Sequence, residues 1–385
     1  MTTSCNVCGA DCSLPLLELH GVPALCNQPC ATASEARAVR RADVDLRYCR
    51  CCGHMFNASF DPAVAEYSAR YENSLGFSER FRTYARECVD ELDSMHELAG
   101  KTVVEVGSGR GEFLAELASR GIATGIGIDP GAQEPELPSR DACRIDLLRE
   151  LFGPRHTTLR ADLVCSRQCL EHLGSPVQSL RNMRSIVAPR GGAVFVEVPN
   201  GTYMLREVAV WDVLYEHVSY FTHLSLANAV SLAAMGASVQ EVFSGQFLVA
   251  HAKATTRPAP LSAPSEQLDS LAMSFARSAA QKVEQVRNAL RGLRREGQRA
   301  VLWGAGTKGV MLLNTLGEDA AVVAAVDVNP RKHGSFVAGT GHPIISPAAV
   351  PDLRPDCVIV VNPVYRAEIE AALAGFGVQA RVLSA

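Results

Sequence analysis

The fold of this 385-residue chain is decided by the stretch Val103-Val-Glu105-Val-Gly107-Ser-Gly109-Arg-Gly111-Glu-Phe113. Its apolar, β-branched start predicts a buried strand over Thr102–Val106, which three glycines at alternate positions follow directly. Because glycine has no β-carbon, the backbone can turn sharply there and approach a ligand closely. The Gly-x-Gly-x-Gly spacing differs from the Gly-x-Gly-x-x-Gly of pyrophosphate-binding turns. An ordinary glycine turn of a Rossmann-like fold is the alternative.

A second strand indicates what such a ligand carries. The pattern predicts a strand over Gly125–Ile128, and Asp129 follows it, eighteen residues after Gly111. Open α/β sheets bind ligands at the carboxyl ends of their strands, where one acidic side chain can accept both hydroxyl protons of a ribose. Glu105 is placed to hold a cationic group, directly or through water. The glycines with Asp129 and Glu105 therefore predict a site for a cationic, ribose-containing ligand.

Further strands follow along the chain, at Asp162–Cys165 and Ala193–Val198, with helical patterns between them. A helical pattern also precedes the first strand, from about Tyr67 to Leu98. Strands that alternate with helices predict a doubly wound α/β sheet.

The C-terminal part is a separate α/β unit. A proline-containing linker covers Thr255–Pro264, and apolar residues then recur at steps of three and four from Leu268 to Leu293. This predicts one long amphipathic helix whose apolar stripe must face another element or another subunit. From Arg299 a second strand–glycine–helix unit begins, with later strands at Val322–Val326 and Cys357–Val361. The expected domains are residues 1–66, 67–254, 255–298 (linker and long helix) and 299–385.

The N-terminal region carries eight of the thirteen cysteines within its first 52 residues. Two knuckles of the form Cys-x-x-Cys-Gly contribute Cys5, Cys8, Cys49 and Cys52. Four thiolates in this pattern suit a closed, structural zinc site. Alternatives are Cys51 or His54 as substitute ligands, or four free thiols in coincidental pairs. The remaining N-terminal cysteines are interpreted as core or loop residues, namely Cys12, Cys26 and Cys30.

Composition excludes several partner classes. The chain is 47% hydrophobic and 20% charged, and its net charge of −4 gives no electrostatic reason to expect nucleic acid or an anionic membrane. The sequence contains neither a run of roughly 20 apolar residues nor a secretory signal at its start. We therefore expect a cytoplasmic protein that acts on a small molecule.

Acid–base candidates lie in the stretch Trp211-Asp-Val-Leu-Tyr215-Glu216-His217. His217 is the candidate general base, since an unperturbed imidazole titrates near pH 6.5. Glu216 or Tyr215 would orient the ring or bind substrate, and His172 is a further candidate. The alternative is a structural histidine packed under a loop.

The segment from Thr102 to Lys253 resembles the class I methyltransferase family, which binds S-adenosylmethionine. The resemblance implies that the three glycines approach this methyl donor, that Asp129 binds its ribose and that Glu105 holds its amino-acid end. In Cys143-Arg-Ile-Asp146-Leu147, it places Asp146 against the adenine amino group. In Asp162–Leu173, the end of the fourth strand at Gln168 lines cofactor and substrate.

The order of the three parts resembles the nucleotide-sugar C-methyltransferases that make branched deoxysugars in antibiotic pathways. Further matching stretches are Trp303-Gly-Ala-Gly306-Thr-Lys-Gly309 and Tyr215-Glu-His217-Val-Ser-Tyr-Phe-Thr222. The resemblance implies a nucleotide-linked 4-keto sugar as substrate, whose C3 proton is removed at the His217 position. The resulting enolate needs positioned donors such as His172 and Tyr215. It also implies that the C-terminal domain helps to hold the nucleotide diphosphate.

Other functions stay open at this point. Lys308 and Lys332 are cations available for phosphate, although the C-terminal glycine turn alternatively belongs to a scaffold without a ligand. The same donor site would serve an O- or N-methyltransferase of another small metabolite. A non-catalytic zinc protein that merely binds S-adenosylmethionine is the third possibility, and the oligomeric state is open.

Overall fold

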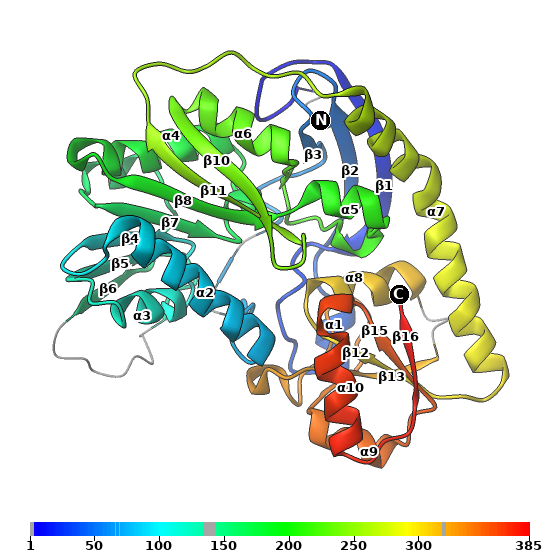
Figure 1. Cartoon of the computed structure of the whole chain (residues 1–385). Coiled ribbons are helices and arrows are strands. Elements are labelled where there is room, and N and C mark those ends of the chain that lie inside the picture. The colour runs from blue at the N-terminus through cyan, green and yellow to red at the C-terminus, as the bar shows by residue number, and fades with distance from the viewer. Residues whose placement is uncertain (1–3, 66, 69, 134–142, 318–320) are drawn as a thin grey trace.

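The computed structural model of the chain describes residues 4–65, 67–68, 70–133, 143–317 and 321–385. Its strands form a seven-stranded, a five-stranded and a four-stranded sheet (Figure 1). The seven-stranded sheet lies on one side of the molecule, and the C-terminal sheet lies below the N-terminal one. The fold is α/β with parallel sheets, as the alternation of strands and helices predicts.

The central sheet has the strand order β10-β11-β8-β7-β4-β5-β6. Its parallel part consists of β4 (Thr102–Val106), β5 (Thr124–Ile128), β6 (Arg144–Leu148), β7 (Leu163–Arg167) and β8 (Ala193–Pro199). The hairpin of β10 (Met235–Val242) and β11 (Phe247–Ala254) adds two strands antiparallel to each other, with β11 antiparallel to β8. The strand order changes direction between β4 and β7, so a crevice for a ligand is expected above β4.

Helices cover both faces of this sheet (Figure 1). α2 (Glu79–His96) and α3 (Glu112–Ala118) pack on one face, where Val103 is buried. α4 (Pro176–Val187) and α6 (His223–Leu232) pack on the other face, where Val104 is buried. Strand residues alternate between the two cores, as the period-two geometry of a strand requires. The sheet is buried on both sides, which explains why its strands are almost continuously apolar.

The N-terminal region forms a sheet of order β1-β2-β3-β9, in which β1 (Ser13–Pro23), β2 (Arg41–Cys49) and β3 (Met55–Asn57) are antiparallel neighbours. α1 (Ala33–Arg37) lies between β1 and β2 in the chain. The fourth strand, β9 (Ser219–Tyr220), comes from the segment after His217 and pairs with β3. The candidate catalytic loop is thus part of the N-terminal sheet.

The C-terminal domain is a five-stranded parallel sheet of order β14-β13-β12-β15-β16. Its strands are β12 (Ala300–Trp303), β13 (Val322–Val326), β14 (Ile344–Ile345), β15 (Cys357–Val360) and β16 (Arg381–Ser384). Its helices are α8 (Thr307–Leu316), α9 (Val350–Leu353) and α10 (Arg366–Gly375). The predicted strand–glycine–helix unit is therefore confirmed as β12 and α8.

Short helical segments connect these elements. One α-helix, α5 (Gly201–Glu207), follows β8. The 3-10 turns are η1 (Pro154–Thr158), η2 (Leu170–His172), η3 (Ala188–Arg190), η4 (Val210–Asp212), η6 (Pro330–Lys332), η7 (Pro347–Ala349) and η8 (Pro363–Tyr365).

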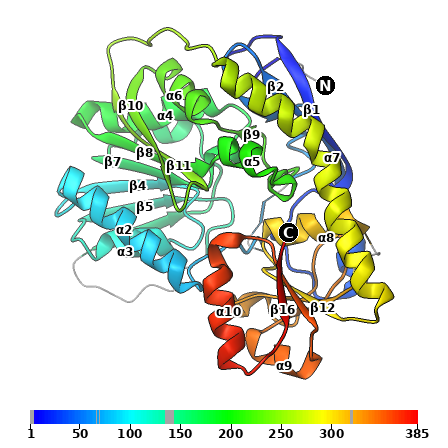
Figure 2. The same cartoon turned by 45° about the vertical axis from the view of Figure 1, so that its right-hand side comes forward.

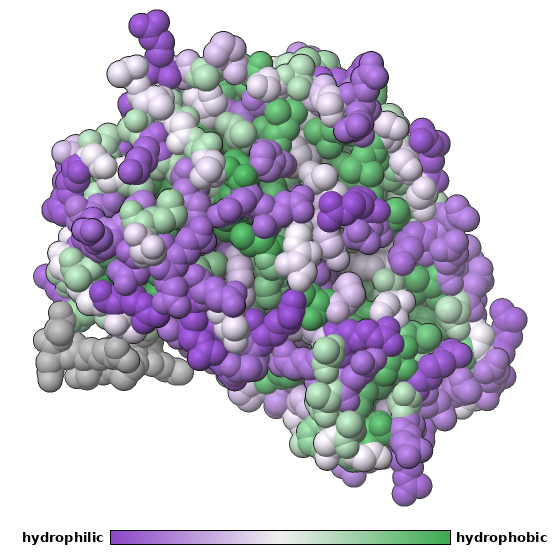
Figure 3. All heavy atoms as spheres, in the orientation of Figure 1, coloured by the Kyte–Doolittle hydropathy of each residue, from purple (hydrophilic) through white to green (hydrophobic). Residues whose placement is uncertain are grey.

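The long helix α7 (Glu266–Arg295) runs along one side of the molecule, from the N-terminal sheet to the C-terminal domain (Figure 2). Its apolar stripe contacts β1, α5 and α8, so elements of the same chain cover it. Hydrophilic side chains line much of the edge where α7 lies (Figure 3). Among the described residues, no helix is long and apolar enough to cross a membrane.

The helix predicted from about Tyr67 begins only at Glu79, so its first part is wrong. Ser78 caps α2 by accepting a hydrogen bond from the Phe81 amide at 3.3 Å. The residues that precede the cap make long-range contacts instead; for example, the Glu72 amide donates to the Asn27 carbonyl at 2.8 Å. Tertiary contacts thus override the local helical pattern.

Phe275 on α7 is fully buried in the core shared by the N-terminal and C-terminal parts. Replacing it with alanine is expected to lower the free energy of unfolding by about 3–5 kcal/mol, because the change leaves a cavity. Urea denaturation measures this, with R277A on the exposed face of the same helix as control. Equal stabilities of F275A and R277A would contradict the packing of α7.

Candidate functional site

The glycine turn after β4 is built for close approach. Gly107, Gly109 and Gly111 all have positive φ angles, of 79°, 52° and 76°. A β-carbon on Gly107 would lie 2.5 Å from the Cβ of Cys169, and one on Gly111 would lie 3.3 Å from a methyl of Leu147. All three positions therefore favour glycine, and a β-carbon at the first and third would also meet neighbouring side chains.

Asp129 holds this turn from the end of β5. Its carboxylate accepts the amide of Gly109 at 3.0 Å and that of Gly131 at 2.6 Å. Burial raises the pKa of this carboxyl, while the two amides lower it. Each carboxylate oxygen has a second lone pair, so Asp129 can still accept hydrogen bonds from a ribose.

Glu105 is buried near the carboxyl end of β4, with 3% of its surface exposed. Its Oε2 atom is buried and has no hydrogen-bond partner among the described residues. Burial raises the pKa of Glu105 to about 8, and Arg167 opposes this rise. An orphaned buried carboxylate oxygen at the ligand-binding edge fits a cationic amino group as its missing partner.

A buried charge cluster that the sequence did not predict lies beside Glu105. Arg167 Nη2 is 3.2 Å from Glu197 Oε2, and the Tyr84 hydroxyl donates to the same carboxylate. The Arg167 guanidinium lies 4.2 Å from the centroid of the Phe113 ring. The only signal in the sequence was an arginine and a glutamate within two otherwise apolar strands.

The two remaining predicted donor-site residues differ in their placement. Gln168 lies at the carboxyl end of β7 with φ 48°, and its Nε2 donates to Glu197 Oε1 at 3.1 Å. Asp146 lies within the edge strand β6, beside Ile126 and two residues before the strand ends at Leu148. Its carboxylate is 2.8 Å from Arg144 Nε. Gln168 joins the cluster around Glu105, whereas Asp146 contacts Arg144 of its own strand.

The histidines form a second cluster. The rings of His172 and His217 are nearly perpendicular, with centroids 4.7 Å apart. His172 Nδ1 is 3.0 Å from the backbone carbonyl of Glu216 and 2.6 Å from the Tyr67 hydroxyl. A carbonyl only accepts, so Nδ1 of His172 carries the proton and its Nε2 keeps a lone pair.

Two buried carboxyls accompany the histidines. Glu216 is fully buried and accepts the Cys26 amide at 3.0 Å and the Tyr67 hydroxyl at 3.4 Å. Burial raises its pKa to about 7, against these hydrogen bonds. Glu171 is 1% exposed, its Oε2 has no partner in the described part of the chain, and burial raises its pKa to about 8.

Both imidazoles are neutral at physiological pH. Burial lowers the pKa of His172 to about 4, although its bond to the Glu216 carbonyl opposes this. Burial lowers the pKa of His217 well below its usual value, and nearby His172 and Lys308 lower it further. A neutral imidazole with a lone pair is the form that accepts a proton.

Tyr215, expected beside His217, is not brought to the cluster. Its hydroxyl accepts the Asp61 amide at 2.9 Å, and its ring packs on Phe60 with centroids 5.6 Å apart. Tyr215 and Glu216 lie in a turn, from which the Glu216 carboxylate reaches Tyr67 and the Tyr215 hydroxyl reaches Asp61. The tyrosine that contacts His172 is Tyr67, which no local motif marked.

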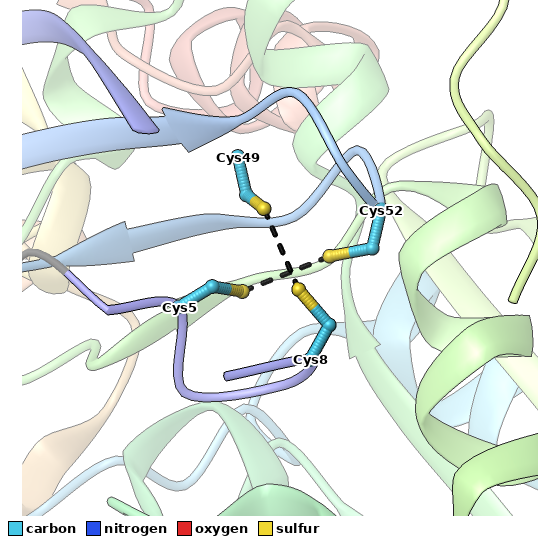
Figure 4. Close-up of side chains that lie close together, drawn as sticks. All are labelled: Cys5, Cys8, Cys49 and Cys52. Carbon is cyan, nitrogen blue, oxygen red and sulfur yellow. Dashed lines mark hydrogen bonds between the residues drawn. The ribbon is translucent and has the colours of Figure 1, made fainter. Parts of the chain in front are cut away.

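The four knuckle cysteines converge on one point (Figure 4). Their sulfur atoms lie within 4.8 Å of one another, with Cys5 to Cys52 at 3.7 Å and Cys8 to Cys49 at 3.6 Å. A regular tetrahedron with Zn–S bonds of about 2.3 Å has edges of about 3.8 Å. The geometry therefore fits a tetrahedral metal.

The two substitute ligands considered from the sequence have other partners. Cys51 forms a disulfide with Cys12. His54 is fully buried, and its Nδ1 is 3.3 Å from Ser225 Oγ. Cys26 and Cys30 are buried, as expected of core cysteines.

A cavity of about 140 Å³ lies between the central sheet and the C-terminal domain. Tyr203 and Trp211 line it from one side and Lys308 from the other, and Lys282 of α7 also reaches it. Lys308 pairs with Asp212, five residues before His217, and is close enough to lower the pKa of His217. The cavity therefore carries aromatic and cationic groups together with the acidic Glu207 and Asp212, and neither His172 nor His217 is among its lining residues.

Lys332, the other predicted phosphate ligand, is an internal cation. It is 4% exposed, and its Nζ contacts Asn27 Oδ1 at 3.3 Å and the Ala305 carbonyl at 3.2 Å. Asp327 Oδ2 lies 3.7 Å away. The amino group thus bridges the glycine turn of the C-terminal domain to the N-terminal region, with its hydrogen bonds already made.

Comparison with known proteins agrees with this arrangement. Residues 78–239 match a family described as a methyltransferase domain, and residues 264–380 match one described as a C-methyltransferase C-terminal domain. The chain is 26% identical to the C-methyltransferase NovU of Streptomyces niveus, over 95% of this chain and 90% of the relative.

Similar solved structures include two methyltransferases. One is a Burkholderia thailandensis 1,6-didemethyltoxoflavin-N1-methyltransferase, with 20% identity and a TM-score of 0.34 over 44% of this chain and 78% of that one. The other is the magnesium protoporphyrin IX methyltransferase of Synechocystis, with 12% identity and a TM-score of 0.36 over 46% and 84%.

The protein is an S-adenosylmethionine-dependent methyltransferase. More closely, it is a class I enzyme that resembles C-methyltransferases along most of its length.

The buried Glu171 makes stability depend on pH. Because its folded pKa of about 8 lies above the unfolded value, its favourable contribution is complete at low pH and is lost as pH rises toward 8. E171Q removes this titration, so its free energy of unfolding should fall less steeply between pH 5 and 8, by up to about 1.4 kcal/mol per pH unit. Denaturant titrations across that range measure the slope, with the exposed E79Q as control. Parallel curves for wild type and E171Q would show that Glu171 is ionised throughout.

Proposed function

We propose that this methyltransferase C-methylates a nucleotide-linked 4-keto deoxysugar in natural-product biosynthesis, with His217 as the general base. The observation that carries the proposal is a neutral, half-buried His172–His217 pair, with Lys308 of a nearby cavity close enough to lower the pKa of His217. The match of residues 264–380 to a C-methyltransferase C-terminal domain supports carbon as the methyl acceptor.

The proton transfer follows from the position of His217. Its lone pair accepts the proton from the carbon beside the ketone, and the electrons of the broken C–H bond form the enolate. S-adenosylmethionine supplies an electrophilic methyl group, and the enolate carbon accepts it as S-adenosylhomocysteine leaves. The Tyr67 hydroxyl is proposed to donate to the enolate oxygen in the role expected of Tyr215, whereas the Nδ1 proton of His172 is already donated to the Glu216 carbonyl.

The donor is proposed to bind at the glycine turn. Asp129 would accept the ribose hydroxyls, and the orphaned Oε2 of Glu105 would accept the amino group. Gln168 would line the site from the end of β7. Asp146 is kept as the proposed adenine ligand, which requires its carboxylate to leave Arg144 when the donor binds.

The nucleotide part of the acceptor is proposed to occupy the cavity above α8. Tyr203 and Trp211 offer surfaces for stacking, and Lys282 offers charge for phosphate. Lys308 is proposed to add its charge by leaving Asp212 when the nucleotide binds. Lys332 is left out of this role because its amino group is already bonded inside the protein.

We also propose that Cys5, Cys8, Cys49 and Cys52 bind one structural zinc ion. The sulfur spacing supports this, and a closed site of four thiolates has no position for substrate. The metal would fasten β2 to the N-terminal residues.

Methyl-labelled S-adenosylmethionine with a panel of nucleotide 4-keto deoxysugars tests the reaction. The proposal expects the label on a ring carbon by carbon NMR, and H217A should be slowed about 10²–10⁴-fold. Because the pKa of His217 is lowered, its protonation should reduce kcat only well below pH 6.5. H223A, at an exposed histidine, is the control. Label on oxygen or nitrogen would favour the alternative methyltransferases, and full activity of H217A would refute the base.

Elemental analysis tests the metal. The purified chain should contain one zinc ion, and C49S should lose it and unfold at a lower temperature, since metal binding contributes directly to folding. C143S, outside the cysteine group, should keep the ion. A wild-type protein without zinc, or a C49S variant that retains it, contradicts this assignment.

A further inference from the structure

Glu72 lies where three parts of the molecule meet. It is 7% exposed and belongs to the segment Tyr67–Ser78, which precedes α2. Its amide donates to the Asn27 carbonyl of the N-terminal region at 2.8 Å. This hydrogen bond fixes the backbone of Glu72, and the Glu72 side chain extends from it between the domains.

One oxygen of Glu72 faces the methyl-donor turn. Oε2 is 3.7 Å from Nε of Arg110, the residue between Gly109 and Gly111. The carboxylate therefore neutralises the one charged side chain within this turn. Arg110 of the glycine turn is thus held through its side chain by Glu72.

The other oxygen faces the C-terminal domain. Oε1 accepts a hydrogen bond from Asn329 Nδ2 at 3.0 Å and lies 3.6 Å from Arg331 Nη1. Arg331 also reaches Glu112 Oε1 at 3.3 Å, at the start of α3. Asn329 and Arg331 are in or beside η6, after β13, and belong to the other α/β unit.

The same segment reaches the histidine cluster. Tyr67, five residues before Glu72, contacts His172 and Glu216 through its hydroxyl. Tyr71 lies against Tyr67, with ring centroids 5.1 Å apart. A shift of the segment at Glu72 would therefore change contacts at both the glycine turn and the cluster of His172 and His217.

We propose that Glu72 is a positioning residue that ties the C-terminal domain to the methyl-donor turn, so that Asn329 and Arg331 set donor affinity without touching the donor. The inference rests on the proposed donor site at the glycine turn. The contacts form a continuous chain from Arg331 through Glu72 to Arg110. A change at the C-terminal end that alters donor affinity must, by thermodynamic linkage, be matched by an equal effect of donor binding on that end.

Calorimetric binding of S-adenosylhomocysteine to the full-length protein tests this. E72Q keeps an acceptor for Asn329 but loses its charge toward both arginines, and R331A acts from the other domain. Each should raise the Kd about 3- to 10-fold, and the double variant should bind no more weakly than E72Q alone. E79Q is the control, because Glu79 pairs with Arg82 and Arg86 on the exposed side of α2.

Two outcomes would overturn the proposal. One is Kd values within twofold of wild type for E72Q and R331A, and the other is a double variant whose loss is the product of the two single losses. N329A removes one neutral hydrogen-bond donor to Glu72. Melting temperatures of all variants, N329A included, show whether a loss of affinity reflects unfolding. D129A separates the two levels: if it binds as wild type does, the donor site itself is misplaced, whereas loss in D129A alone rejects only the role of Glu72.

Discussion

The turn between β4 and α3 depends on one contact, the close approach of Gly107 to Cys169. This approach leaves no room for a β-carbon, and it brings the end of β7 directly against the turn. Asp129 then fixes the middle of the turn through the Gly109 amide. Three neighbouring strands thus meet at one edge, where the order of the sheet changes direction. The donor turn, Gln168 and the histidines after β7 all take their positions from this edge.

Several ionisable groups are buried close together around that edge of the sheet, and burying them costs folding free energy. Glu105, Glu171 and Glu216 all lie out of solvent with raised pKa values, while Arg167 with Glu197 forms a compensated pair. One carboxylate oxygen of Glu105 and one of Glu171 have no hydrogen-bond partner among the described residues. Buried unpaired carboxylates destabilise a fold unless a ligand or a proton completes them. Glu105 and Glu171 lie at the turn proposed to bind the donor and beside His172, the two places where the proposed function requires a small molecule.

All three parts of the chain contribute residues to one hydrophobic cluster, so they are not independent units. β9, just after His217, completes the N-terminal sheet, and Lys332 of the C-terminal domain donates into the N-terminal region. The long helix α7 packs on both. The loop that carries His217 is therefore held by the cysteine-bearing sheet. Under the proposed function, a metal among those cysteines would act on catalysis through the position of β3 and β9.

The sequence by itself determined the α/β fold, the strands around the glycine turn, the long helix and the pairing of the two cysteine knuckles, because each depends on local spacing or periodicity. Only the tertiary structure decided that α2 starts at Glu79, that Tyr215 points toward Asp61, and that Tyr67 meets His172. It also revealed Arg167, Glu197 and Glu72 as charged residues inside the molecule. These facts depend on contacts between residues far apart in the chain, which periodicity does not encode. Burial then fixed which carboxyls and imidazoles are neutral, since a pKa follows from surroundings that only the folded chain supplies.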